Sequence, residues 1–200
     1  EAGADRYLLR FETSNRELYA RIHPPLGGKE SDRIALLRRL RGMGYEIGSG
    51  VMIGIPGQRY EDLAEDIEVF KTLDLDMIGV GPYLPHPATP LSGMAGAGGG
   101  EQVPNTEGMT YKVIALTRLA CPEANIPSTT ALATLNLAQG RELGLQRGAN
   151  VVMPNLTPAR YRALYEIYPS KACVSETARQ CHGCMKGRIA SIGRTVGSGA

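Results

Sequence analysis

Apolar positions along the chain follow two different periods, which predicts alternating strands and helices. Compact apolar runs predict five strands, at 6–12, 47–55, 77–80, 126–130 and 150–153. Helical spacing or capping residues predict helices over 14–22, from 31 to the glycines at 42 and 44, over 61–73, 110–119 and 138–146, and after Thr157 and Pro158. The long connection at 81–108 contains a Gly/Ala-rich run at 93–100, which we interpret as a flexible insertion.

Five strands, each followed by a helix, predict a parallel sheet with right-handed crossovers. An open doubly wound sheet and part of a (β/α)8 barrel both fit this order. The open sheet usually carries a Gly-rich nucleotide-binding turn after its first strand, and this sequence has none there. Polar and sulfur-bearing residues at successive strand ends favour the mouth of a barrel instead. We therefore expect an α/β fold, a partial (β/α)8 TIM barrel of about five of the eight units with outer helices, and the abrupt start suggests a fragment.

Charge and hydropathy exclude two classes of function. The 200 residues include 22 Lys and Arg against 20 Asp and Glu, a formal net charge of +2, without the dense basic patch of an electrostatic nucleic-acid binder. No apolar run approaches the roughly 20 residues that a membrane-spanning helix needs. We expect neither nucleic acid nor membrane as a partner, and a cytoplasmic location.

Three of the four cysteines have the spacing C-x7-C-x2-C, formed by Cys173, Cys181 and Cys184. A C-x2-C pair brings two thiolates close enough to share a metal or cluster, and the third thiolate would complete a three-sulfur site. An iron-sulfur cluster, a zinc site that includes His182, and free or redox-active thiols all remain open. Cys121 fits a buried core position better.

Charged residues near the end of the first strand point to a polar ligand. Arg10 and Glu12 have the same parity, so their side chains point the same way, and a zwitterion would satisfy both. Arg33 is placed to clamp a carboxylate. An internal ion pair of Glu12 with Arg10 or Arg33 is an equal alternative.

The remaining strand-end residues have structural interpretations beside the functional ones. Thr129 and Thr130 offer hydroxyls to a substrate carboxylate, or cap the next helix. The strand methionines and the tyrosines near position 165 more often fill a core.

Several strings in one order resemble the HydE family of radical S-adenosylmethionine (SAM) enzymes, in the biotin-synthase-like group. They are RYLLRFET (6–13), GSGVMIGIPGQ (48–58), GVGPYLPHPATP (79–90), NIPSTT (125–130) and GANVVMPNLTP (148–158). The resemblance runs over nearly the whole chain. The terminal cysteine trio has the spacing of that family's accessory cluster.

The resemblance implies a complete barrel in the parent protein and a C-x3-C-x2-C loop that holds a 4Fe-4S cluster. This sequence has no C-x3-C-x2-C, so the principal cluster would be bound by a missing N-terminal part and the chain alone would be inactive. The same comparison divides the chain into barrel residues 1–172 and an accessory iron-sulfur segment at 173–200.

The resemblance also assigns residues. It places SAM against Glu12, Arg33 and Met52, the substrate cavity at Arg10, Met77, Thr129, Thr130, Met153, Tyr165 and Tyr168, and the accessory iron-sulfur cluster on Cys173, Cys181 and Cys184. It implies an organometallic or small cysteine-derived substrate, and other hydrogenase maturation proteins as partners. A methylornithine-synthase-like or biotin-synthase-like enzyme and a non-catalytic metal-binding module are the alternatives.

Overall fold

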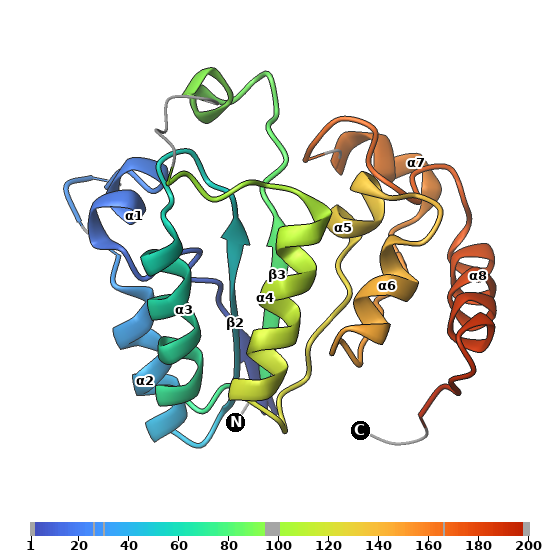
Figure 1. Cartoon of the computed structure of the whole chain (residues 1–200), viewed down its shortest axis with the longest axis horizontal. Helices are drawn as coiled ribbons and strands as arrows, with labels where there is room; N and C mark the ends of the chain where they lie inside the picture. Colours follow the sequence, from blue (N-terminus) through green and yellow to red (C-terminus); the bar gives the residue numbers. More distant parts are fainter. Residues whose placement is uncertain (1–2, 26, 30, 95–100, 166, 198–200) are drawn as a thin grey trace.

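The computed structural model describes residues 3–25, 27–29, 31–94, 101–165 and 167–197. Its sheet consists of β1 (Arg6–Leu8), β2 (Glu46–Ile53) and β3 (Met77–Pro82). The three strands are parallel and lie in the order β1-β2-β3 (Figure 1). The α/β class and the parallel sheet predicted from the sequence are therefore confirmed.

Single parallel bridges continue this order beyond β3. Met77 pairs with Asn125, and Pro127 pairs with Val151. The predicted fourth and fifth strands are thus single bridges in place of regular strands, because Pro127 has no amide hydrogen to donate and the chain turns into a helix soon afterwards. The described residues reproduce five parallel positions in sequence order, while the count of eight units stays a prediction.

The helices between the strands cover one face of the sheet. In all, the described residues form helices α1 (Arg16–Ile22), α2 (Arg33–Gly42), α3 (Tyr60–Thr72), α4 (Glu107–Ala120), α5 (Thr130–Leu135), α6 (Gly140–Gln146), α7 (Ala159–Arg162) and α8 (Ala178–Ser191), with 3-10 turns η1 (Pro90–Met94) and η2 (Ala163–Tyr165). Helices α2 and α3 contact β2, and α4 contacts β3. In Figure 1, α4 lies in front of β3, and α3 lies to the left of β2. Sequential parallel strands with helices on one side are the arrangement of a singly wound barrel.

Polar side chains fix where most helices begin. Asn15, Asp32, Thr106 and Thr177 each accept a hydrogen bond from a backbone N–H in the first turn of the helix that follows. The cap of α1 is therefore Asn15, and the helix begins two residues after the predicted start at 14. None of the helices in the described ranges is both long and apolar enough to cross a bilayer.

The core lies between this helical layer and the facing side of the sheet. Ile47, Val51 and Ile53 of β2 are fully buried, and so is Phe70 of α3, whose ring lies 5.6 Å from that of Phe11. Each such side chain contributes about 1.5–3 kcal/mol through burial. Alternate residues of β2 thus face the helices, and the residues between them face the opposite side of the sheet.

The C-terminal third differs from the sequence prediction. The segment 126–130 does not remain extended, because Thr129 caps α5 through its hydroxyl and Thr130 is already helical. The helix predicted after Pro158 is short: it ends at Arg162, and the 3-10 turn η2 follows it. Tyr165 is 70% exposed, so its interpretation as a core residue is wrong. Of the predicted insertion 93–100, residues 95–100 lie outside the described residues.

Candidate functional site

The side of the sheet away from the helices is formed by glycines. Gly48 and Gly50 of β2 lie beside Met77 and Gly79 of β3 in the parallel register. A Cβ atom on Gly50 would lie only 2.1 Å from the carbonyl oxygen of Gly79, so no other residue fits there without moving the strands apart. The absence of side chains leaves a shallow floor, which we call the glycine face (residues 48, 50, 79 and 81).

Longer side chains from three segments lie over this floor. A Cβ on Gly79 would come 3.3 Å from Nη1 of Arg10, and one on Gly81 would come 3.0 Å from Oγ1 of Thr129. A Cβ on Gly48 would meet both Leu8 and Met77. The structure therefore brings Arg10, Met77 and Thr129 to one face of the sheet.

Arg10 and Glu12 form an ion pair above the glycine face. Nε of Arg10 donates to Oε1 of Glu12 at 2.9 Å, and Nη2 donates to Oε2 at 3.1 Å and to the carbonyl oxygen of Val51 at 2.6 Å. The Glu12 side chain is 14% exposed. The internal ion pair that the sequence left open is therefore present. A bidentate fork uses one lone pair of each carboxylate oxygen and leaves others for a ligand.

The backbone at Glu12 is unusual. Its φ is +65°, in the left-handed region that L-residues other than Gly, Asn and Asp rarely adopt. Two backbone bonds hold it there: its N–H donates to the carbonyl oxygen of Gly50, and its own carbonyl accepts from Met52. Strained residues of this kind concentrate at ligand sites. Met52, half-buried, has the same strand parity as Gly48 and Gly50.

Arg33 approaches the same strand from the helical side. Its Nη1 donates to the carbonyl oxygen of Arg10 at 2.6 Å, and its guanidinium carbon lies 5.8 Å from the centre of the Tyr19 ring. It makes no ion pair with Glu12 in the described structure. Arg33 therefore holds the backbone of the segment after β1 that carries the Arg10–Glu12 pair.

The other predicted cavity residues are less closely joined. Thr130 opens α5, and its carbonyl oxygen accepts a bond from the hydroxyl of Thr134. Met153 is 50% exposed and Tyr165 is 70% exposed. Tyr165 packs under Nζ of Lys171, and burial raises the pKa of the Tyr168 phenol. Among the described residues, no hydrogen bond or ion pair joins Met153, Tyr165 or Tyr168 to the glycine face, so their place in the cavity stays a prediction.

The three predicted cluster cysteines are only partly gathered. Cys181 is buried, and its sulfur accepts a bond from the backbone N–H of Asn155 at 3.2 Å. Cys173, with φ +64°, lies near it: burial raises the pKa of the Cys173 thiol, and the negative charge of Cys181 adds to this. Cys184 is exposed, on α8. No trio of His, Cys, Asp or Glu side chains in the described ranges is arranged to hold a metal ion. As it stands, this conformation does not assemble a three-sulfur site.

Two buried arginines beside these cysteines were missed by the sequence analysis. Arg162 is 2% exposed and donates to the carbonyl oxygens of Thr157, Cys173 and Asn155 at 2.7, 3.0 and 2.7 Å. Arg141, 3% exposed, lies 4.0 Å from the sulfur of Cys173. Neither forms an ion pair with a carboxylate in the described part of the chain. The residues around them in the sequence give no sign of this, because only the fold brings the two guanidinium groups into the interior.

Comparison with known proteins tests the resemblance that the strand motifs suggested. No model of a protein family matches the chain. The chain is 44% identical over 197 residues to the "[FeFe] hydrogenase maturase subunit HydE" of Thermotoga maritima, which covers 98% of this chain and 53% of that protein. It is 29% identical over 158 residues to the "3-methylornithine synthase" of Methanosarcina barkeri, covering 79% of this chain and 41% of the relative. The "Biotin synthase" of Streptomyces coelicolor is 27% identical over 146 residues, 73% of this chain and 31% of the relative.

The chain spans about half the length of the HydE protein that it matches, and less of the other two. Identity at this level over nearly every residue of the chain, with two weaker matches in related enzymes, confirms the predicted resemblance. The chain is a homologue of HydE and is more distantly similar to methylornithine synthase and biotin synthase.

Proposed function

We propose that this chain is part of a radical SAM enzyme of HydE type, which acts in assembly of the FeFe-hydrogenase active-site cluster. The supporting observation is 44% identity over 98% of the chain, against 29% to methylornithine synthase and 27% to biotin synthase. The part proposed here provides the strand ends that hold SAM and the substrate. No observation favours the alternative of a non-catalytic metal-binding module.

The residues at the end of β1 fit the amino-acid portion of SAM. Glu12 retains lone pairs outside the Arg10 fork, and these would accept hydrogen bonds from an ammonium group. Arg33 would donate to the carboxylate with the N–H groups it does not use on Arg10. Met52, beside Glu12 in the backbone ladder, would contact the adenosyl side. When bound and reductively cleaved, SAM supplies a 5′-deoxyadenosyl radical.

The glycine face would then receive the substrate. Arg10 and Thr129, which lie over Gly79 and Gly81, would orient the carboxylate of an organometallic or small cysteine-derived molecule. Thr130, Met77, Met153, Tyr165 and Tyr168 complete the proposed cavity. A closed barrel over this floor would exclude water from a reactive carbon, and fixed orientation would be the main contribution of the protein.

The principal 4Fe-4S cluster does not fit the residues of this chain. The sequence contains no C-x3-C-x2-C motif. We infer that another part of the parent protein holds that cluster and that this chain alone does not cleave SAM.

The cysteine segment, residues 173–200, is proposed to hold an accessory iron-sulfur cluster, apart from barrel residues 1–172. The buried charges of Arg141 and Arg162 support an anionic group near Cys173 and Cys181, because an uncompensated buried cation is costly. Cys184 would have to turn inward to join them. The proposed setting is the cytoplasm, with other hydrogenase maturation proteins as partners.

A chimera tests the proposed function. The segment of Thermotoga maritima HydE that aligns with this chain is replaced by the chain, and anaerobic formation of 5′-deoxyadenosine is measured with SAM and a reductant. We expect turnover with the native segment replaced, and a SAM affinity about tenfold weaker in Glu12→Gln, since the neutral amide loses one charge-assisted bond.

The matched control is Glu61→Gln, which removes an exposed carboxylate on α3. A correctly folded chimera that binds the iron of its principal cluster but never releases 5′-deoxyadenosine contradicts the proposed function. Equal SAM affinity in Glu12→Gln and the parent removes Glu12 from the site. Iron content in Cys181→Ser, compared with the parent chimera, decides the accessory cluster: equal iron in both means that it is absent.

A further inference from the structure

The edge of β2 that faces β1 is incomplete at its carboxyl end. In a parallel pair, every second residue of a strand directs its backbone groups to the same neighbour. The carbonyl oxygens of Gly48 and Gly50 accept hydrogen bonds from the backbone N–H groups of Leu9 and Glu12 at 2.9 and 3.0 Å. The next carbonyl oxygen on this edge belongs to Met52, and a strand partner for it would have to come from the residues after Glu12.

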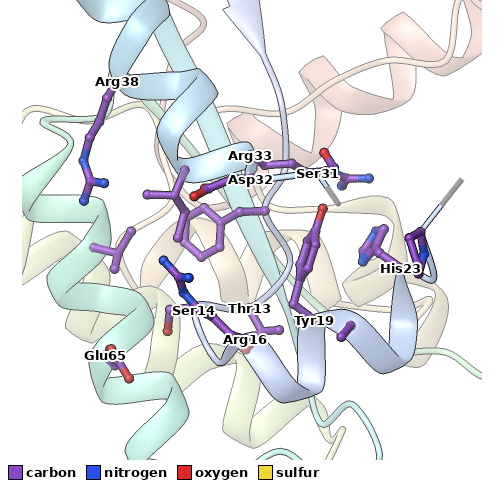
Figure 2. Close-up of a pocket in the computed structure, with 15 residues that line it drawn as sticks. Thr13, Ser14, Arg16, Tyr19, His23, Ser31, Asp32, Arg33, Arg38 and Glu65 are labelled. Carbon is purple, nitrogen blue, oxygen red and sulfur yellow. The ribbon is translucent and has the colours of Figure 1, made fainter. Parts of the chain in front are cut away.

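The residues after Glu12 do not supply that partner. The N–H of Thr13 turns back to the carbonyl oxygen of Phe11 at 2.8 Å, and the N–H of Ser14 donates to Oδ1 of Asp66 on α3 at 2.6 Å. Figure 2 shows Thr13 and Ser14 on the turn that leads into α1, where both line a cavity formed with residues of α1, α2 and α3. The chain therefore leaves the sheet directly after Glu12.

The side-chain amide of Gln58 fills the vacant position beside β2. Its Nε2 donates to the carbonyl oxygen of Met52 at 3.0 Å, and its Oε1 accepts the backbone N–H of Gly54 at 2.6 Å. Gln58 is fully buried, and Gly54, with φ +83°, turns the chain so that this side chain can return to the strand that precedes it. Because a carboxamide offers one acceptor group and one donor group, as a strand residue does, Gln58 takes the place of one residue of a neighbouring strand.

Backbone hydrogen bonds connect Gln58 to the conformation of Glu12. Met52 accepts from Gln58 through its carbonyl oxygen and donates its own N–H to the carbonyl oxygen of Glu12 at 3.3 Å. Glu12 has the left-handed backbone, with φ +65°, and such a conformation persists only where the surrounding contacts hold it. Without the amide of Gln58, the carbonyl oxygen of Met52 would lose its partner, and the strand end to which Glu12 is bonded would loosen.

We propose that Gln58 is a positioning residue for Glu12, and that it keeps the Glu12 carboxylate in place for the ammonium group of SAM. The proposal rests on the function proposed above, in which Glu12 binds SAM. Gln58 itself acts from the interior, since it is fully buried and both polar atoms of its side chain are bonded to the backbone of β2 and the residues that follow it. It lets the chain leave the sheet at Glu12 while the hydrogen-bonded edge of β2 continues by one more residue.

Amide hydrogen exchange on the chain itself tests the structural part of the proposal without SAM. Gln58→Met removes both bonds at a similar side-chain length, and we expect the Met52 amide to exchange at least about tenfold faster, with the Leu9 amide on the same edge unchanged. In Gln58→Glu, burial keeps the introduced carboxyl group protonated at about pH 5, where it again offers a donor and an acceptor and should restore the protection of Met52. Equal protection of Met52 in the parent and in Gln58→Met overturns the proposal, and so does a failure of Gln58→Glu to restore it.

SAM affinity in the chimera with Thermotoga maritima HydE separates positioning from general support. We expect Gln58→Met to weaken SAM binding by about fivefold and Glu12→Gln by about tenfold. Because Gln58 acts through Glu12, the double variant should remain near the tenfold loss of Glu12→Gln alone, whereas independent effects would multiply to about fiftyfold.

The matched control is Gln102→Met. The Gln102 amide donates to the carbonyl oxygen of Ile55 at 3.1 Å and accepts the N–H of Gly57 at 2.6 Å, so it supports the same loop without a bond to Met52. An equal loss of affinity in Gln102→Met, a multiplied loss in the double variant, or full affinity in Gln58→Met would each overturn the proposal and leave the proposed function standing. Full affinity in Glu12→Gln would instead remove Glu12 from the SAM site, and the assigned role of Gln58 would fall with it.

Discussion

Asp66 shows how one buried carboxyl group makes the stability of the chain depend on pH. It lies on α3, is fully buried, and accepts the backbone N–H of Ser14 at 2.6 Å. Its second oxygen has no partner among the described residues. Desolvation raises its pKa to about 7, against bonds from Ser14 that lower it, and nearby Asp62 and Glu65 raise it further.

We predict that Asp66→Asn makes stability less dependent on pH. The folded state holds a proton on Asp66 up to about pH 7, whereas the unfolded state loses it near the ordinary aspartate pKa of 3.8. Stability is therefore lost as the pH rises through this window, by an amount on the order of a few kcal/mol. The amide cannot ionise and keeps an oxygen for Ser14, so the variant should gain relative to the parent between pH 5 and about 8 in urea unfolding. Glu68→Gln, an exposed change on the same helix, should show no such gain; an equal gain in both would contradict the prediction.

At the scale of single residues, the sequence indicated which side chains are chemically important better than it indicated their contacts and backbone conformation. Shared parity placed Arg10 and Glu12 on one side, and the structure confirms their proximity. Their mutual ion pair was one of two open interpretations, because a spacing of two residues does not decide between a ligand and a neighbour. The positive φ of Glu12 and the burial of Arg162 depend on residues far along the chain, so no local pattern could have shown them.

At the scale of elements, β2 and β3 are joined by a contact that only glycine permits. The closest approach is at Gly50, opposite Gly79. Strand pairs normally include side chains that fix their register, and here the other faces of the two strands do this through Val51 and Val80. The glycines therefore stabilise nothing by burial and serve to keep one face bare.

We predict that Gly50→Ala destabilises the chain by at least about 2 kcal/mol, since the methyl group would lie 2.1 Å from a backbone oxygen and the strands would have to separate. The free energy of unfolding from urea titration measures it. Gly187→Ala is the control, because its Cβ meets open space in the interior of α8 and should stabilise by about 0.5–1 kcal/mol. A neutral Gly50→Ala would show that the strands pack less tightly than described.

Elements with strong periodicity were predicted best. The segment 61–73 closely matches α3, because a clear apolar stripe meets a large core. The prediction of a strand at 126–130 was wrong. Its β-compatible residues stand directly before the cap Thr129, and within this segment only Pro127 forms a bridge, with Val151. Such short elements depend on neighbours in space more than on their own residues.

For the whole molecule, the sheet ends at β1. This strand pairs only with β2 among the described residues, and all three of its residues are exposed, Tyr7 by 48% and Leu8 by 52%. An open edge with apolar side chains is a template for pairing with another chain.

We predict that the isolated chain self-associates through this edge. Sedimentation velocity over a range of concentrations should show oligomers, and Tyr7→Lys should shift the population toward monomer, since edge lysines oppose strand pairing. The control is Leu119→Lys, which places the same charge at a 79% exposed position on α4. A concentration-independent monomer in the parent, or dissociation by the α4 variant alone, would contradict an association through β1.

The bare floor of the sheet has a consequence for changing which ligand the glycine face could accept. The four glycines have no side chains that a substitution could shorten, so the space above the backbone is already at its maximum there. Substitutions in the strands could only reduce this space, through methyl groups that the strands tolerate poorly. Ligand selectivity would therefore have to be changed at the side chains that lie over the glycine face, Arg10, Met77 and Thr129. Engineering of the site for a new ligand would therefore begin at these three side chains and leave the glycines of the sheet unchanged.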